Sequence, residues 1–497
     1  MPSPRSAPPS GPCDVAGVSS LVDLLFGGED ADDSLLMHAG GVDHSLAEVR
    51  ARSEEIASRL VDAGMEPGAP VGVMLPNAAV VPALFAVWRA GGVYVPLNPR
   101  LGASDLAHIK ASVGPSVVVT VPEHVGRFDV EPVVVVGEAV TVRPGVVGHR
   151  RFDAGVALIQ LTSGTTGRPK PVLLEHAGVR ALLDNVIPTL RRGGDSGKAA
   201  MPNLIPVSLS LWAGIYQVLF ARIVGAPVVV MDGFETREFA DLVRRFQIRS
   251  TVLPPAAMTL LSDDESITSL APLRYVRSIT APLSPLQARR FRDRFGLHVL
   301  NCYGQTEIGG EIIGWSAADS KEHGDDKLGA VGRPHTGVEV RTDAASGELQ
   351  VQTPALSGGY ADGSDLTERL TPDGWFCTGD VGHQDEDGFV WIDGRLSDMI
   401  NRGGLKVFPA EVEEVLRLSP EVADAAVVGA VDGRLGEVPW AFVVATSATP
   451  DVAALEALCR EHLAPYKVPA RFEVVDQLPR NEIGKVLGSA LLDGVRR

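Results

Sequence analysis

"LTSGTTGRPKP", residues 161–171, places two glycines and several hydroxyl side chains before a lysine. The stretch differs from the P-loop, in which glycine, four residues and Gly-Lys-Ser/Thr open a helix. Here Gly164 and Gly167 are three positions apart, Pro169 precedes Lys170, and Pro171 disfavours a helix after the lysine. The flanking runs GVALIQL and VLLEH are typical of strands. The sequence therefore predicts a loop at the tip of two strands.

The predicted tip is rich in hydrogen-bond donors. Glycines leave backbone N–H groups accessible, and hydroxyls and an ammonium stand beside them, so the loop can surround a polyphosphate. The candidate ligand groups are Thr162, Ser163, Gly164, Thr165, Thr166, Gly167 and Lys170. A solvated Gly/Thr hairpin is the alternative, and the loop alone does not decide between the two.

The composition restricts the class of protein. A chain of 497 residues predicts more than one domain. Its 45 basic and 62 acidic residues give a net charge of −17, which argues against a nucleic-acid partner or stable membrane association. The four cysteines lack the spacing of a zinc site or a disulfide framework. Residues 1–15, rich in Pro and Ser, predict a disordered leader and not a signal peptide, so we expect a cytoplasmic protein.

Helical patterns alternate with valine-rich runs after the leader, as in residues 45–64 (SLAEVRARSEEIASRLVDAG) followed by 69–76 (APVGVMLP). This alternation is typical of a parallel α/β sheet with helices on both faces. The most apolar window, residues 78–99, contains Arg89 and a Gly pair. We expect it to form a buried helix followed by a strand, not a membrane span.

The pattern changes near residue 325. Short strands with Gly, Asp and Ser turns follow, which indicates an antiparallel, barrel-like β element. After Arg395, a helix ended by Pro420 and further strands and a helix indicate a small α+β module. The predicted fold is α/β, with a large N-terminal domain of α/β subdomains and the β element at 16–394. A small, mobile α+β C-terminal domain follows at 395–497.

Four motifs occur in order along the chain: the loop at 161–171, NCYGQTEIGG at 301–310, the TGD-containing segment at 374–413, and LPRNEIGKV at 478–486. Together they resemble the adenylate-forming superfamily of acyl-CoA synthetases, nonribosomal peptide adenylation domains and luciferases. The resemblance implies ATP-dependent activation of a carboxylic acid as an acyl-AMP with release of pyrophosphate. Transfer to a thiol follows, most often that of coenzyme A. The implied cofactors are ATP and Mg²⁺, with coenzyme A as co-substrate.

The resemblance implies a role for individual residues. The loop at 162–170 would hold the β- and γ-phosphates, Thr306 would contact the α-phosphate, and Glu307 would bind Mg²⁺. Tyr303 and Asp380 match positions that contact adenine and the two ribose hydroxyls. The remaining matches are Arg395, near ribose and phosphate, and Lys485, the mobile lysine of the C-terminal domain. The implied catalytic residues are Lys170, Thr306, Glu307 and Lys485.

Departures from the family pattern concentrate around the acid. Pro171 and Thr280 replace common glycines, Ser397 stands at the hinge position where Asp or Lys is usual, and Leu209 stands where a histidine or aromatic residue is common. The implied substrate positions are Leu209, Cys302, Gly304, Gly309 and Gly310. The last two would leave space for a ring or chain, and core packing is the alternative for Leu209 and Cys302.

The acceptor remains open at this stage. Gly403 and Gly404 match positions where a missing side chain leaves room for pantetheine, with simple turn geometry as the alternative. A carrier protein could replace coenzyme A, or the enzyme could activate nitrite towards an aryl amine. A catalytically dead nucleotide-binding regulator is the other class, against which the retained Lys170, Glu307, Asp380 and Lys485 argue. The acid and the oligomeric state are not specified by the sequence.

Overall fold

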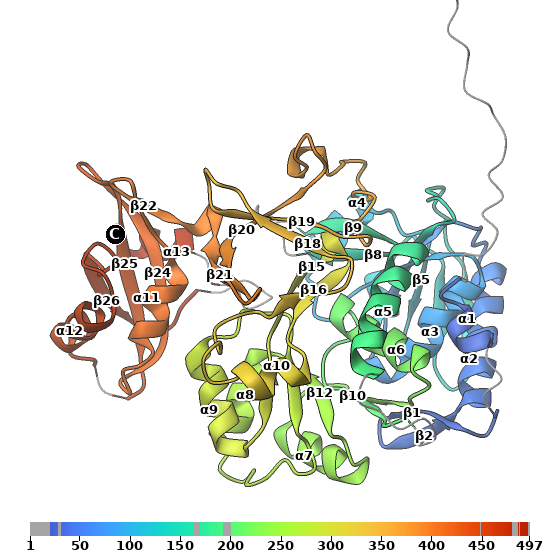
Figure 1. The fold of residues 1–497 in the computed structure, drawn as a ribbon. Helices are drawn as coiled ribbons and strands as arrows, with labels where there is room; N and C mark the ends of the chain where they lie inside the picture. The colour runs from blue at the N-terminus through green and yellow to red at the C-terminus, as the bar shows by residue number, and fades with distance from the viewer. Residues whose placement is uncertain are drawn as a thin grey trace, which may run out of the picture.

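The computed structural model describes residues 20–27, 31–162, 169–191, 200–447, 449–479, 486 and 488–495 (Figure 1). The leader expected at 1–15 lies outside them. The described chain begins with the short helix α1 (Asp23–Phe26).

A seven-stranded sheet dominates the first part of the chain. Its order is β7-β6-β5-β3-β4-β8-β9, with parallel inner strands and antiparallel pairs at both edges. The inner strands β3, β4 and β5 are buried along their whole length, as expected for a parallel sheet covered on both faces. The strands are β3 (Pro70–Met74), β4 (Val93–Pro96), β5 (Val117–Thr120), β6 (Val133–Val136), β7 (Val140–Arg143), β8 (Val156–Thr162) and β9 (Lys170–Glu175).

Two smaller sheets form the next layer. One has the order β10-β11-β1-β2, and the other is the parallel sheet β12-β13-β14. Thr251 Oγ1 donates to the Leu204 carbonyl oxygen at 2.8 Å, which links the two sheets. The strands are β1 (Leu35–Ala39), β2 (Val42–Ser45), β10 (Asn203–Ile205), β11 (Val228–Val230), β12 (Ser250–Leu253), β13 (Tyr275–Ser278) and β14 (His298–Leu300).

Helices separate and cover these layers (Figure 1). On β4, Tyr94 packs into the core shared with α2 and α3, whereas Val93 and Val95 pack into the core beneath α4. The predicted α/β fold is therefore confirmed, including the buried helix and strand expected at 78–99. The helices are α2 (Leu46–Asp62), α3 (Asn77–Arg89), α4 (Ala103–Ser112), α5 (His176–Arg191), α6 (Trp212–Ile223), α7 (Thr236–Arg245), α8 (Pro255–Asp263) and α9 (Pro285–Phe295).

Local sequence determines where these helices begin and end. At the start of α2, the Ser45 hydroxyl accepts from the Glu48 N–H at 3.2 Å, and the Glu48 carboxylate accepts from the Ser45 N–H at 2.8 Å. This reciprocal pair is a capping box. At the end of α9, Gly296 takes a left-handed conformation with φ of 66°, which glycine adopts at little cost.

The antiparallel β element follows these layers. The strands β18-β19-β20-β21 form a meander, and an isolated bridge between Gly332 and Val390 joins it to the sheet β15-β16-β17. The antiparallel element expected after residue 325 is present. The strands of the two sheets are β15 (Cys302–Gln305), β16 (Gly310–Gly314), β17 (Arg333–Pro334), β18 (Glu339–Thr342), β19 (Glu348–Gln352), β20 (Phe376–Gln384) and β21 (Val390–Arg395). The remaining short elements before residue 395 are α10 (Ala317–His323) and the 3₁₀ turns η1 (Pro122–Arg127), η2 (Thr306–Ile308) and η3 (Thr367–Arg369).

The last part of the chain is a smaller α+β unit, drawn in orange and red in Figure 1. It has its own core, which includes Val412, Leu416, Val443 and Leu455. The boundary between residues 394 and 395 stays a prediction. The elements are η4 (Leu396–Asp398), β22 (Ile400–Arg402), β23 (Leu405–Val407), α11 (Pro409–Leu416), β24 (Val422–Asp432), β25 (Gly436–Ala445), α12 (Val452–His462), β26 (Arg471–Val475) and α13 (Gly488–Val495).

Candidate active site

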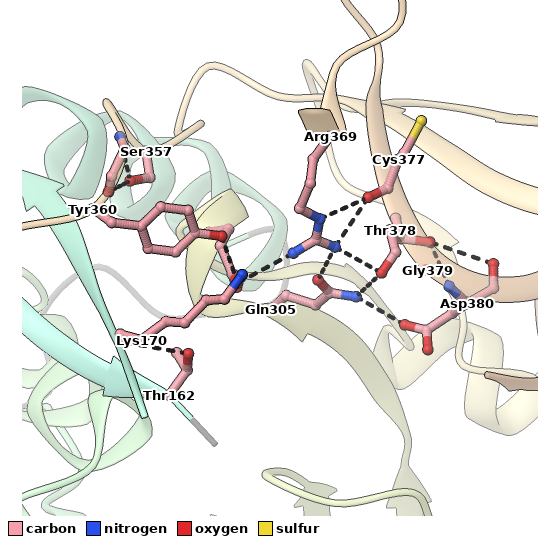
Figure 2. Close-up of polar contacts among 12 residues, drawn as sticks. Thr162, Lys170, Gln305, Ser357, Tyr360, Arg369, Cys377, Thr378, Gly379 and Asp380 are labelled. Carbon is pink, nitrogen blue, oxygen red and sulfur yellow. Dashed lines mark hydrogen bonds and ion pairs between the residues drawn. The ribbon is translucent and has the colours of Figure 1, made fainter. Parts of the chain in front are cut away.

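The β8–β9 hairpin brings the two ends of the predicted phosphate loop together. Thr162 pairs with Lys170 in register, and its Oγ1 donates to the Lys170 carbonyl oxygen at 3.3 Å. The Lys170 side chain is exposed, and its Nζ lies 5.2 Å from the centre of the Tyr360 ring (Figure 2). Pro171 continues β9 opposite Leu161, so the strand accommodates this departure. The loop residues Ser163, Gly164, Thr165, Thr166 and Gly167 lie outside the described residues.

Glu307 is a buried carboxylate beside this hairpin. The turn η2 begins at the partly exposed Thr306 and carries Glu307, which is 8% exposed. Glu307 Oε1 accepts from the Arg369 guanidinium at 3.2 Å and from the Tyr360 hydroxyl at 3.4 Å. An ionised carboxylate with so little solvent needs a cation or hydrogen bonds around it. Arg369 and Tyr360 supply both.

Asp380 is the centre of a second polar group. Its Oδ2 accepts from the Tyr303 hydroxyl at 2.6 Å and from Gln305 Nε2 at 2.8 Å, and Arg395 Nε lies 3.3 Å from Oδ1. Burial and the Asp380 charge raise the pKa of Tyr303 well above its usual value, so its hydroxyl stays protonated and donates. The β20–β21 pairing sets Asp380 opposite Arg395. Three predicted nucleotide residues, Tyr303, Asp380 and Arg395, therefore lie in contact.

Arg369 connects the two groups and has no signal in the motifs. Besides Glu307, its guanidinium donates to Gln305 Oε1 at 3.1 Å and to the Thr378 carbonyl oxygen at 2.8 Å (Figure 2). It also donates to the Cys377 carbonyl oxygen at 3.0 Å. Gln305 then reaches Asp380 through its amide nitrogen. Sequence reasoning missed Arg369 and Tyr360, because both lie far from Glu307 along the chain and in no quoted motif.

The predicted substrate position Leu209 lies in the hydrophobic core. Its side chain is 0% exposed, and its backbone N–H donates to Asn77 Oδ1 at 2.8 Å. The structure thus favours core packing for this residue. Cys302 is partly exposed, and its thiol donates to the Ser278 carbonyl oxygen at 2.9 Å. Burial and the nearby Glu311 charge raise the pKa of Cys302 well above its usual value.

The space beside the predicted pocket glycines is filled. A Cβ on Gly309 would lie 2.6 Å from the Ala355 Cβ, and one on Gly310 would lie 2.7 Å from Trp212 Nε1. A Cβ on Gly304 would lie 1.8 Å from the Gly310 carbonyl oxygen. Close packing and positive φ account for the missing side chains at Gly309 and Gly310, and the room for a ring or chain stays a prediction. Their proximity to the acid stays a prediction.

The expected hinge and thiol positions lie on turns. Ser397 is exposed in η4, and its hydroxyl donates to Asp398 Oδ1 at 2.9 Å. Gly403 and Gly404 form the two-residue turn between β22 and β23, with φ of 62° and 92°. Two positive φ values are typical of a tight hairpin turn. Turn geometry thus accounts for both glycines, and a thiol tunnel stays a prediction.

The predicted catalytic residue Lys485 is not among the described residues. Within those residues, no group of three or more His, Cys, Asp or Glu side chains is placed to hold a metal ion. No helix of the described chain is long and apolar enough to cross a bilayer.

Comparisons with known proteins show which family the chain belongs to. Residues 29–361 match the AMP-binding enzyme family, and residues 411–485 match the AMP-binding enzyme C-terminal domain. The indoleacetate–CoA ligase of Aromatoleum aromaticum is 32% identical over 479 residues, covering 89% of this chain and 92% of that protein.

Two solved structures have the same fold. The o-succinylbenzoate CoA synthetase of Bacillus subtilis, in complex with its acyl-adenylate intermediate, matches with a TM-score of 0.82 and 26% identity, covering 95% of this chain and 98% of that one. The amide bond synthetase of Marinactinospora thermotolerans matches with a TM-score of 0.81 and 27% identity, covering 95% and 99%. From the family matches, the relative and the fold together, the chain belongs to the AMP-binding enzyme family of the adenylate-forming superfamily and is an AMP-forming acid–thiol ligase.

Proposed function

We propose that this enzyme activates a carboxylic acid with ATP and transfers the acyl group to the thiol of coenzyme A. The observation that carries the proposal is one polar network with the exposed cation Lys170 at one end and the Asp380 carboxylate at the other. A nucleoside triphosphate has anionic phosphates at one end and ribose hydroxyls nearer the other. Cations suit the phosphates, and a carboxylate accepts from hydroxyls. The order of these groups along the network therefore supports the proposal that the site binds a nucleoside triphosphate.

Asp380 would receive the ribose hydroxyls. It is 4% exposed, and the Tyr303 hydroxyl and the Gln305 amide keep its Oδ2 oriented. A carboxylate has two oxygens and several acceptor positions, so it can bind a pair of neighbouring hydroxyls. Arg395, next to Oδ1, would contact ribose or the α-phosphate.

Glu307 fits a magnesium ion. Mg²⁺ in nucleotide sites is held by one or two carboxylates, with phosphates and water completing its shell. Glu307 is the carboxylate on the phosphate side, and Arg369 and Tyr360 fix it through Oε1. Bound magnesium would neutralise charge on the phosphate oxygens while pyrophosphate leaves.

The chemistry proceeds in two steps. In the first, an oxygen of the acid attacks the α-phosphorus, and the bond to pyrophosphate breaks. Both partners are anionic, so Lys170, the Thr306 hydroxyl and Lys485 would offset their repulsion. In the second, the coenzyme A sulfur, after losing its proton, attacks the acyl carbon, and AMP leaves with the bonding electrons.

Pyrophosphate release tests both steps. The enzyme is incubated with Mg·ATP and a panel of aromatic, short-chain and long-chain acids, with and without coenzyme A. We expect a single turnover of pyrophosphate without coenzyme A and multiple turnovers with it, together with a thioester in equal amount. An acid-independent ATPase, or turnover without thioester, would contradict the proposal.

The structural similarity to an amide bond synthetase favours a second candidate, in which an amine receives the acyl group. The same assay separates the two. Adding a primary amine in place of coenzyme A should leave the enzyme at a single turnover if the thiol is the acceptor. Multiple turnovers with stoichiometric amide would identify the amine.

A further inference from the structure

An ion cluster joins β13, β16 and the segment after β17. Arg277 on β13 is paired with Glu311 on β16, and His335 Nε2 lies 3.0 Å from the same oxygen, Oε1. Arg277 also donates to the Trp315 carbonyl oxygen at 2.9 Å. The bare Gly314 leaves room for the cluster, since a Cβ there would lie 2.5 Å from Glu311 Oε1. The cluster therefore places a guanidinium and an imidazole within hydrogen-bonding distance of one carboxylate oxygen.

The two charges of the cluster cancel. Burial opposes ionisation of Glu311, but the Arg277 charge and the His335 hydrogen bond hold its pKa below the usual value. Burial likewise disfavours the charged guanidinium of Arg277, and Glu311 more than compensates, so its pKa is raised. Glu311 is therefore a carboxylate and Arg277 a cation at neutral pH. The side chains of Arg277 and Glu311 keep 18% and 16% exposure, so the pair borders space that solvent reaches.

This space adjoins the predicted acid pocket. Glu311 follows Gly310 directly, and its charge contributes to the raised pKa of Cys302. Trp212 and Tyr216 of α6 pack edge to face at 6.0 Å between ring centres. Burial, and then the Glu311 charge, raise the pKa of Tyr216. Among the described residues, none forms a hydrogen bond with the Tyr216 hydroxyl. A Cβ on Gly310 would lie 2.7 Å from Trp212 Nε1, so the Trp212–Tyr216 pair neighbours the residue that precedes Glu311.

We infer that Arg277, Glu311 and His335 select acids whose far end carries a neutral hydrogen-bonding group, such as a hydroxyl or amide. The inference rests on the proposed function. A second carboxylate or an ammonium would add an uncompensated charge beside a pair that is already neutral, which is costly away from bulk water. A hydrocarbon would cover the cluster without replacing its water. A hydroxyl can donate to the Glu311 carboxylate and accept from Tyr216.

Matched acids test the inference through kcat/KM for pyrophosphate release. One series is butyrate, γ-hydroxybutyrate, succinate and γ-aminobutyrate; the other is benzoate, the hydroxybenzoates, terephthalate and p-aminomethylbenzoate. We expect a hydroxy acid to exceed its unsubstituted and charged counterparts by at least about tenfold, because sites built to hydrogen-bond a substrate group reject analogues that lack it.

Two variants connect the preference to the cluster. In Arg277→Leu/Glu311→Leu, apolar side chains replace the pair, a change that folded proteins tolerate. The hydroxy acid should lose its advantage over the unsubstituted acid, and the loss should appear as a higher KM for the hydroxy acid. In Glu311→Gln, Arg277 is uncompensated, so succinate or terephthalate should gain. The control is Lys110→Leu/Glu131→Leu, which removes a partly buried pair at 3.0 Å between α4 and the segment before β6 and should leave the ranking unchanged.

Each outcome decides the matter. A wild-type preference for a dicarboxylate, an amine or a hydrocarbon overturns the inference, as does an unchanged ranking in both cluster variants. If the double variant unfolds in a thermal melt, Glu311→Gln alone carries the test. If no acid releases pyrophosphate, the proposed function fails and the inference falls with it, whereas turnover with an unaltered ranking defeats the inference alone.

Discussion

Replacing Arg369 with methionine tests the candidate site at its centre. The guanidinium contacts Glu307 Oε1 at 3.2 Å, Gln305 Oε1 at 3.1 Å and the Thr378 carbonyl oxygen at 2.8 Å. It also lies 4.3 Å from the centre of the Phe376 ring. Methionine keeps an aliphatic chain against that ring but donates no hydrogen bond. The change thus removes the polar contacts and preserves most of the packing.

The size of the effect follows from the burial of the pair. Removing one partner of a fully buried ion pair costs about 3–5 kcal/mol. Since 28% of the Arg369 side chain and 11% of the Glu307 side chain are exposed, solvent screens part of this interaction. We expect a loss of about 2–3 kcal/mol in transition-state stabilisation, which corresponds to roughly 30- to 160-fold in kcat/KM for adenylation.

Pyrophosphate release at saturating Mg²⁺ measures this loss, and thermal melts establish that each variant is folded. Arg341→Met is the matched control, because Arg341 lies 4.4 Å from the Trp375 ring centre and 2.7 Å from Asp373 on the same meander. That pair is exposed, so its loss should leave kcat/KM for adenylation near the wild-type value. The activity of Arg369→Lys should lie between those of Arg369→Met and the wild type. Lysine keeps the positive charge but lacks the planar guanidinium that donates several hydrogen bonds in a fixed arrangement. Equal activity in Arg369→Met and Arg341→Met would refute the reasoning.

Three further results are expected from the predicted roles. Lys485→Ala should slow adenylation by roughly 10²- to 10³-fold, the loss of one preorganised donor, while supplied acyl-AMP is still converted to thioester at a near wild-type rate; equal slowing of both steps would contradict this. Gly404→Leu should block thioester formation and spare adenylation, whereas Gly436→Leu, which places leucine at a similar φ of 78°, should impair neither; equal effects would indicate backbone strain. Removing Mg²⁺ should abolish pyrophosphate release, and a zinc-selective chelator should not; full activity without any divalent ion would exclude a metal at Glu307.

Much of the fold was predictable because its signals are local. The helix and strand at 78–99 follow from one apolar window. Ser45 and Glu48 mark the start of α2 only three residues apart. The phosphate hairpin follows from two strand-like runs with a glycine-rich stretch between them. In each case, a few neighbouring residues determine the local backbone conformation.

The contacts within the site were not predictable in the same way. Arg369 is 62 residues from Glu307 along the chain, and Tyr360 is 53 residues from it. No spacing rule connects residues so far apart, because the sheet arrangement brings them together. The close packing around the predicted pocket glycines was not predictable for a related reason. Gly309 and Gly310 lack side chains, but Ala355 and Trp212, which belong to other segments of the chain, lie against them.

If Asp380 receives the ribose hydroxyls as proposed, they would approach a carboxylate that already has hydrogen-bond partners. In the described state, Tyr303, Gln305 and Arg395 already contact its carboxylate. Ribose hydroxyls would replace some of these contacts with hydrogen bonds of the same kind, so the net gain per bond is modest. The position of the Asp380 carboxylate then matters more than the number of its hydrogen bonds. Arg369 fixes the position of Gln305, because its guanidinium donates both to Gln305 Oε1 and to the Thr378 carbonyl oxygen. Ribose binding would leave both contacts in place. Loss of Arg369 should therefore weaken ATP binding as well as adenylation.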